Sequence, residues 1–265
     1  MLLIVAALLE EVLGVLNLGR FDRLDAPTYC RLYRQSRGQD AKTDLGILLT
    51  GTGEQRTDKA LKWALPQLKP KNILSVGFSG GTQPILQTGD LFLAICLRGV
   101  TGSPYLWELE QLTEEIHPSE SLFRIARNAA ENAGLDFEFG TMVNTPVIAR
   151  TAKMKSWIGT TLEAGSVDME SFTVGKHAKT HGVGFMSVRA VVDNVYEDLP
   201  EVVNHINTNP AGGRLLPVIK YVLRRPNEIP RLMQLRRSVK TAQRNLTEFY
   251  SKFTEEFAEE SKIYR

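Results

Sequence analysis

Short apolar runs alternate with amphipathic stretches along the first two hundred residues. Runs rich in Val, Ile and Leu, bounded by glycine or polar residues, are typical of buried parallel strands. Such runs occupy residues 2–8, 45–49, 73–76, 91–95, 137–143 and 182–192. Helical spacing follows the runs, most clearly over residues 119–134, between a possible Ser119 cap and a Gly134 stop. This alternation predicts an α/β domain with three layers, α/β/α.

The last fifty residues have a different pattern. Apolar side chains recur every three or four residues and predict one long amphipathic helix: Leu232, Leu235, Val239, Ala242, Leu246, Phe249, Phe253 and Phe257. Pro226 and Pro230 precede it, so an earlier helix is expected to end near Arg225. We therefore predict a catalytic domain over residues 1–213 and a helical C-terminal extension over residues 214–265. The extension is expected to pack on the domain or on a second subunit.

Composition excludes several classes of protein. With 43% hydrophobic and 23% charged residues among 265, the chain is typical of a soluble globular protein. Cys30 and Cys96 lack metal-ligand spacing and are expected to be reduced packing residues of a cytoplasmic protein. The four histidines form no zinc motif, so no metal is expected. The N-terminal apolar run lacks a basic segment and is too short to span a bilayer, which favours a first buried strand.

Charge is distributed unevenly along the chain. The formal net charge is +2, yet residues 214–244 carry nine Lys or Arg and one Glu, a net charge of +8. Residues 245–265 sum to −2, which leaves −4 for residues 1–213. Because the basic excess is confined to the tail, a core that binds nucleic acid is not expected.

Two carboxylates are predicted to meet at one edge of the sheet. Glu170 follows a short strand and begins a helix that runs to about His181, and the next strand stops at Asp193. Ligands of open α/β sheets bind outside the carboxyl ends of the strands. The alternative for Asp193 is an ordinary turn, since Asp and Asn side chains bond to nearby backbone.

Glycine-rich segments and a pair of acids follow other strands. Residues 51–53 and 77–81 are glycine-rich turns at strand ends and predict close approach of backbone to a ligand. Arg56, one turn into the following helix, either contacts an anion or is a solvated helix residue. Glu10 and Glu11 follow the first strand, where they either cap a helix or place one carboxylate in the pocket.

Five sequence segments, taken together in their order along the chain, resemble the nucleoside phosphorylase and nucleosidase superfamily over about residues 1–200. They are AALLEEV, TGTG, VGFSGG followed by GD, VDMES, and VRAVVDN. This family holds purine nucleoside phosphorylase and methylthioadenosine/S-adenosylhomocysteine nucleosidase. The resemblance implies an α/β/α fold around a central mixed sheet, a small-molecule nucleoside substrate, no cofactor and a homo-oligomer.

The resemblance also implies roles for single residues. Asp193 matches the general acid that protonates the leaving purine, and Glu11 matches the glutamate that orients the attacking water. Glu170 matches the carboxylate that holds the ribose hydroxyls, with Met169 packing under the sugar.

Four further positions fall where the family contacts the base or the nucleophile: Ser79, Gly80, Val147 and Ile148. Phe78 departs from the pattern, because nucleosidases usually have Ser or Thr there.

Hydrolysis of an adenine nucleoside is favoured over phosphorolysis. The chain lacks the Gly-Asp-Pro-x-Arg phosphate segment, and the Glu11 carboxylate would repel phosphate. By analogy with inverting glycosidases, the carboxyls of Glu11 and Asp193 are expected to lie about 6.5–9.5 Å apart. A phosphorylase and a non-catalytic nucleoside-binding protein remain the alternatives.

The tail resembles a narrower subgroup. DLP after Asp193, and VLRRPNEIPRLMQL further on, resemble hopanoid-associated phosphorylases. This resemblance implies a lipid-linked nucleoside such as adenosylhopane and peripheral contact of the basic helices with a membrane. The alternative is a solvated basic helix face.

Overall fold

The structure is a computed structural model that describes residues 1–36, 44–101, 111–203 and 228–263. The strands are β1 Leu2–Ala6, β2 Phe21–Leu24, β3 Arg31–Gln35, β4 Leu45–Leu49, β5 Asn72–Gly81, β6 Leu91–Thr101, β7 Gln111–Leu112, β8 Phe137–Asn144, β9 Ser166–Asp168 and β10 Gly184–Asp193. The helices are η1 Leu9–Glu11, α1 Leu13–Asn17, α2 Glu54–Leu68, α3 Glu120–Asn132, α4 Ala152–Thr161, α5 Ser171–His181 and α8 Ile229–Ile263.

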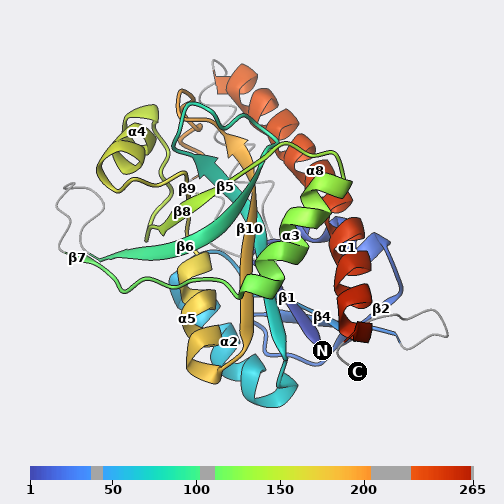
Figure 1. The fold of residues 1–265 in the computed structure, drawn as a ribbon. Helices are drawn as coiled ribbons and strands as arrows, with labels where there is room; N and C mark the ends of the chain where they lie inside the picture. Colours follow the sequence, from blue (N-terminus) through green and yellow to red (C-terminus); the bar gives the residue numbers. More distant parts are fainter. Residues whose placement is uncertain (37–43, 102–110, 204–227, 264–265) are drawn as a thin grey trace.

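The strands form one mixed sheet, as predicted (Figure 1). The order is β10-β6-β8-β9-β5-β1-β4-β3-β2, with β7 beside β6. The pairs β1–β4, β1–β5, β5–β10, β6–β8 and β8–β9 are parallel, whereas β6–β10, β5–β9, β3–β4 and β2–β3 are antiparallel. Because β10 pairs with both β5 and β6, five strands close into a ring.

Helices cover both faces of the sheet, which confirms the α/β/α layering. Alternate side chains of a strand point to opposite faces. Accordingly Leu2, Ile4 and Ala6 of β1 pack in one core with α3 and α8. Leu3 and Val5 pack in a second core with α2 and α5. All five are buried, which explains why β1 is an uninterrupted apolar run.

Helix α8 confirms the long C-terminal helix. Its second half fills the first core, with Ala242, Leu246, Phe249, Phe253 and Phe257 buried. Its first half is more exposed. The predicted boundary between residues 213 and 214, and the helix expected to end near Arg225, fall in residues 204–227, outside the described part of the chain. Among the described helices, none is long and apolar enough to cross a membrane.

The turn predicted at residues 77–81 is wrong. These residues are the second half of β5, which runs on through Gly81. The absence of a side chain at Gly77 leaves space for the carboxyl group of Glu11. Strands β2 and β3 and helix α4 have no counterpart among the predicted elements. Cys30 and Cys96 are free and buried, in agreement with the prediction.

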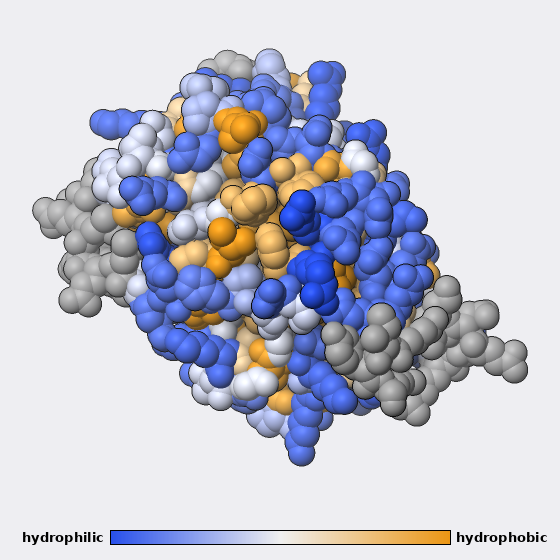
Figure 2. Space-filling view, viewed as in Figure 1, coloured by the Kyte–Doolittle hydropathy of each residue, from blue (hydrophilic) through white to orange (hydrophobic). Residues whose placement is uncertain are grey.

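One face of the sheet carries apolar surface. Figure 2 shows apolar residues gathered where β6 and β8 lie, surrounded by hydrophilic ones. Ile95 of β6 and Phe139 of β8 are 37% and 53% exposed. The ring of Phe139 meets that of Phe123 edge-on.

Candidate active site

Glu11 ends the short helix η1 with its carboxyl buried at the end of β1. Its Oε2 accepts hydrogen bonds from the amides of Ala7 (2.9 Å) and Leu8 (2.8 Å). Its Oε1 accepts one from the amide of Phe78 on β5 (3.1 Å). Burial raises the pKa of Glu11 to about 7, although these hydrogen bonds and the charge of Arg189 oppose the rise. The carboxyl thus caps the start of a helix and also contacts the amide of Phe78 on β5.

Gly77 of β5 makes room for that carboxyl. A Cβ atom built at Gly77 would lie 2.8 Å from Oε1 of Glu11, closer than real Cβ contacts allow. A side chain at this position would therefore displace the carboxyl from its three amide donors.

Glu170 lies at the N-terminal end of α5, beside the loop that follows β4. Its Oε1 accepts a hydrogen bond from the amide of Gly53 (2.6 Å). The Cε atom of Met169 lies 3.9 Å from the Cβ position of Gly53. Burial, followed by the charges of Asp168 and Glu11, raises the pKa of Glu170 to about 8. The charge of Glu11 therefore contributes to the raised pKa of Glu170.

A buried ion pair lies beside these acids. The Nε atom of Arg189 on β10 donates to Oδ2 of Asp168 on β9 (2.9 Å), and its Nη2 donates to Ser75 Oγ (3.0 Å). The same Asp168 oxygen accepts from the amide (3.0 Å) and hydroxyl (2.6 Å) of Ser171. The network ties β5, β9, α5 and β10 together. Its Arg189 charge lowers the pKa of Glu170, opposing the effect of burial.

Asp193 ends β10 and is buried, with 3% of its surface exposed. Its Oδ2 is paired with Nζ of Lys155 on α4. The same Nζ donates to the backbone carbonyls of Asn194 (2.5 Å) and Glu197 (2.7 Å). Burial raises the pKa of Asp193 to about 6; Lys155 opposes this rise and Glu197 adds to it.

The turn interpretation applies to the next residue. Oδ1 of Asn194 accepts a hydrogen bond from the amide of Tyr196 (3.0 Å), a local turn contact. Asp193 makes no such contact within the described residues; its carboxyl bonds to a helix 38 residues away in sequence.

Strand β5 links Glu11 to Asp193. Glu11 bonds to the amide of Phe78, and Oδ2 of Asp193 lies 3.5 Å from the Cβ position of Gly80. Since an extended strand rises about 3.4 Å per residue, residues 78 and 80 lie roughly 7 Å apart. The strands β1, β4, β5 and β10 run parallel, so Glu11 and Asp193 lie at the same end of the sheet, and the hydrogen bond from the amide of Gly53, after β4, holds Glu170 at that end as well.

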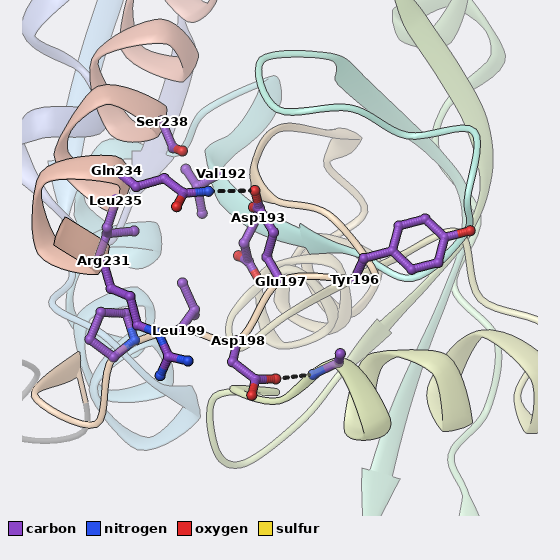
Figure 3. Close-up of a pocket in the computed structure, with 12 residues that line it drawn as sticks. Val192, Asp193, Tyr196, Glu197, Asp198, Leu199, Arg231, Gln234, Leu235 and Ser238 are labelled. Carbon is purple, nitrogen blue, oxygen red and sulfur yellow. Dashed lines mark hydrogen bonds between the residues drawn. The ribbon is translucent and has the colours of Figure 1, made fainter. Parts of the chain in front are cut away.

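A pocket of about 300 Å³ borders Asp193 (Figure 3). It lies between the segment after β10 and the first turns of α8. Gln234 of α8 donates to Glu197 (2.8 Å), and Asp198 accepts from the amide of Ala152 at the start of α4 (2.7 Å). Glu11 and Glu170 do not line this pocket. Its lining residues are Ala152, Val192, Asp193, Tyr196, Glu197, Asp198, Leu199, Pro200, Arg231, Gln234, Leu235 and Ser238.

The other predicted positions are placed as follows. Ser79 is buried and its hydroxyl accepts a hydrogen bond from Ser166 (2.8 Å). Val147 and Ile148 are half-buried in the loop between β8 and α4, and neither lines the pocket. Arg56 is half-buried in the first turn of α2.

One group of metal-ligating side chains occurs in the described part of the chain. Ligand atoms of Cys96, Glu115 and His117 lie within 4.8 Å of one another. Glu115 already accepts two hydrogen bonds from Arg98, at 2.9 and 2.5 Å. Because Arg98 supplies the positive charge, we assign no metal to this group.

Two features of the site are not predicted by the sequence pattern. Lys155 lies in a helix of mixed residues, where a lysine is ordinarily solvated. The pair Asp168–Arg189 lies within the motifs VDMES and VRAVVDN, but nothing in their spacing shows that the two side chains meet.

Comparisons with known proteins identify the family of this chain and its relatives. The sequence matches the family described as the phosphorylase superfamily over residues 2–214. It is 24% identical over 196 residues to the 5′-methylthioadenosine/S-adenosylhomocysteine nucleosidase of Glaesserella parasuis serovar 5 (strain SH0165), covering 72% of this chain and 84% of that protein. The corresponding nucleosidase of Desulfotalea psychrophila (strain LSv54 / DSM 12343) is 22% identical over 203 residues, 73% of this chain and 84% of that one.

Solved structures show the same fold at low identity. Futalosine hydrolase of Helicobacter pylori strain 26695 superimposes with a TM-score of 0.73 at 17% identity, covering 96% of this chain and 97% of that one. The 5′-methylthioadenosine/S-adenosylhomocysteine nucleosidase of Neisseria meningitidis, in complex with methylthio-immucillin-A, gives 0.72 at 15% identity with the same coverage. The family match covers most of the sequence. The chain therefore belongs to the phosphorylase superfamily.

Proposed function

We propose that this protein is an N-ribosyl hydrolase that releases adenine from a 5′-substituted adenine nucleoside. The observation that carries this proposal is three carboxyl groups with raised pKa values, the buried Glu11 and Asp193 and the half-buried Glu170, at one end of the sheet. Perturbed acids cluster at catalytic sites because burial costs stability and is retained where chemistry needs it. The nucleosidases among its relatives support the same reaction.

The reaction needs assistance on both sides of the N-glycosidic bond. As the bond from the anomeric carbon to N9 breaks, its electron pair passes to the purine, and Asp193 gives its proton to N7 so that the base leaves neutral. Water attacks the anomeric carbon, and its proton passes to Glu11. Glu170 accepts hydrogen bonds from the ribose hydroxyls, with Met169 against the sugar.

Two features of the geometry support this assignment. Glu11 and Asp193 both contact β5, at Phe78 and Gly80, so the proposed base and the proposed acid lie beside positions two residues apart on one strand. Glu11 accepts three amide hydrogen bonds that fix its orientation. An oriented carboxylate favours water as the nucleophile and disfavours phosphate.

The direct test is adenine release in phosphate-free buffer. 5′-Methylthioadenosine, S-adenosylhomocysteine and other 5′-substituted adenosines are incubated with the protein, and the free base is quantified by chromatography. Asp193→Asn is expected to lower kcat by about 10²–10⁴-fold. Asp22→Asn, an exposed acid on β2, is the matched control. Turnover that appears only with added phosphate would favour phosphorolysis, and ligand binding with no turnover would favour a nucleoside-binding protein.

We further propose that the substituent is a lipid, as in adenosylhopane, and that the first half of α8 contacts the membrane surface. Ile229 and Met233 are 40% and 54% exposed, and the neighbouring Arg236 and Arg237 are exposed as well. Apolar and basic side chains in this arrangement suit anionic headgroups. Co-sedimentation with vesicles containing phosphatidylglycerol, and its loss in an Arg236→Glu/Arg237→Glu variant, would support the contact. Equal recovery with phosphatidylcholine vesicles would contradict it.

We also propose a homo-oligomer. The exposed apolar side chains Ile95 and Phe139, on adjacent strands, are the kind of surface that second subunits cover. Light scattering measures the mass directly, and a particle of one chain at micromolar concentration would rule the proposal out.

A further inference from the structure

Lys155 is a fully buried lysine, and all three of its N–H donors have acceptors. They are Oδ2 of Asp193 and the backbone carbonyls of Asn194 and Glu197. An ammonium group has three donors and no acceptor, so this arrangement satisfies the charged form completely. Every acceptor belongs to Asp193 or to the segment that follows it. The lysine therefore binds the candidate general acid together with its loop.

A glycine of the neighbouring strand lies against this contact. A Cβ atom at Gly80 would lie 3.3 Å from Cδ of Lys155 and 3.5 Å from Oδ2 of Asp193. The second glycine of VGFSGG thus lies beside the ion pair.

The loop is held from a second side. Asp198 accepts a hydrogen bond from the first amide of α4, and Leu199 and Arg150 exchange backbone and side-chain hydrogen bonds at 2.9 and 3.1 Å. Helix α4 and residues 193–199 consequently form one rigid unit. Among the described residues, no hydrogen bond engages Oδ1 of Asp193, which leaves that oxygen available to a ligand.

We infer that Lys155 is a positioning residue for the general acid: it fixes Oδ2 of Asp193 and leaves Oδ1 to protonate the leaving base. This inference deepens the proposed function and rests on it. Before the reaction the proton is on Asp193 and Lys155 is an ammonium ion. When the proton passes to the base, the new carboxylate is paired with that ammonium instead of standing alone in a buried site. Proton donation is thereby favoured.

The positive charge of Lys155 lowers the pKa of Asp193. An opposite charge within hydrogen-bond distance lowers the pKa of a carboxyl group, typically by roughly 1–3 units. Lys155 has that effect on Asp193, against the larger effect of burial. Removing the ammonium should raise the pKa of Asp193. The pH optimum of kcat/KM lies midway between the pKa values of Glu11 and Asp193, so it should then move to higher pH.

The experiment compares Lys155→Met with Lys153→Met, an exposed lysine on the same helix. We expect Lys155→Met to lower kcat about 10-fold or more, to leave KM nearly unchanged and to shift the pH optimum of kcat/KM upward by at least about half a unit. Lys153→Met should match the wild type. A folded Lys155→Met protein with an unshifted pH optimum would overturn the inference, even if its activity were lower.

Two further measurements separate this inference from its premise. Lys155→Ala should regain activity with added ethylammonium and not with ethanol, because the charge is what the cavity lacks. The pKa of Asp193, followed by carbon NMR of the labelled carboxyl, should rise in Lys155→Met whether or not the protein turns over any nucleoside. A shifted pKa in a protein inactive on every nucleoside would reject the proposed function alone. An unshifted pKa would reject the role of Lys155.

Discussion

Of the three candidate catalytic carboxyls, Glu11 and Asp193 are buried and Glu170 is half-buried, and their pKa values differ. Burial raises the pKa of Glu11 to about 7 and that of Asp193 to about 6, a smaller rise because Lys155 opposes it. The proposed base therefore has a higher pKa than the proposed acid. The reactive form, with Glu11 ionised and Asp193 protonated, is then a minor species at every pH and is most abundant between the two values.

A bell-shaped pH profile follows. Below pH 7 Glu11 takes up a proton and cannot accept one from water; above pH 6 Asp193 loses the proton that the base needs. We expect kcat/KM to peak near pH 6.5, midway between the two pKa values. Initial rates measured from pH 4.5 to 9 test this. A rate that keeps rising beyond pH 8 would contradict the assignment of Asp193 as the acid.

Glu170 gives a prediction about stability. Its pKa is 4.5 in the unfolded chain and about 8 in the folded one, so the folded state holds the proton more tightly. Its contribution to stability is therefore complete below pH 4.5 and is lost as pH rises through 8. Glu170→Gln cannot ionise. The difference in Tm between Glu170→Gln and the wild type should therefore increase from pH 5 to pH 9. The increase should be about 2–4 °C for each kcal/mol of stability that the wild type loses. Parallel Tm curves would refute the prediction.

The residues that sequence could and could not predict differ in a physical way. Glu11 and Asp193 follow parallel strands, whose carboxyl ends meet at one edge of the sheet, so the sequence pattern predicts that the two acids lie at that edge. Glu170 follows β9, which is antiparallel to β5, and it reaches the same edge through its hydrogen bond from Gly53. Lys155 and Arg189 act through side chains that reach across other elements. No spacing rule gives the direction of such a side chain, because it depends on how helix and sheet pack.

Among the elements, β5 has the most direct effect on the site. Its glycines at positions 77 and 80 leave space for two different acids, one at each position. A glycine inside a strand weakens the strand. In β5 the missing side chains allow the carboxyl groups to lie directly against the strand.

Gly77→Ala tests this use of the strand. The added methyl group would lie 2.8 Å from Oε1 of Glu11, and this carboxyl cannot move without losing amide hydrogen bonds. We expect kcat to fall by up to about 10²-fold, as misplacement of a catalytic group by about 1 Å can cause. Gly140→Ala in β8, where the new atom meets only the ring of Phe92 at 3.4 Å, is the control. Equal kcat values for both variants would argue against a positioned Glu11.

Element prediction succeeded where burial was complete. β1, β4 and β10 are buried apolar runs, and α3 and α5 have clear stops at Gly134 and Gly182, both with positive φ. β2, with the sequence FDRL, is mostly exposed at the sheet edge, so its residues lack an apolar pattern. In α4 polar and apolar residues are mixed around the helix, because Lys155 is buried by an ion pair and not by hydrophobicity.

At the scale of the whole molecule, α8 is part of the main core. Phe249, Phe253 and Phe257 stack in series along it, with ring centroids 5.5 and 6.1 Å apart, and the hydroxyl of Tyr250 donates to the backbone carbonyl of Glu11 at 3.0 Å. The C-terminal helix thus supports the segment that carries the proposed base.

Phe253→Ala should destabilise the protein by about 3–5 kcal/mol, since Phe253 has no exposed surface and its truncation leaves a cavity. Met233→Ala, on the exposed first half of the same helix, should change stability by no more than about 0.5 kcal/mol. Urea unfolding of both variants measures the difference. Similar midpoints would mean that the tail folds independently of the domain.

The ring formed by β5, β10, β6, β8 and β9 limits where this chain can change in length. β10 is hydrogen-bonded along both edges, to β5 over residues 184–193 and to β6 at residues 188–190. A single inserted residue inside it would disturb two ladders at once and turn every later side chain to the opposite face. The ladders on both edges therefore set the register of β10 over residues 188–190, and with it the place of the acid that ends the strand.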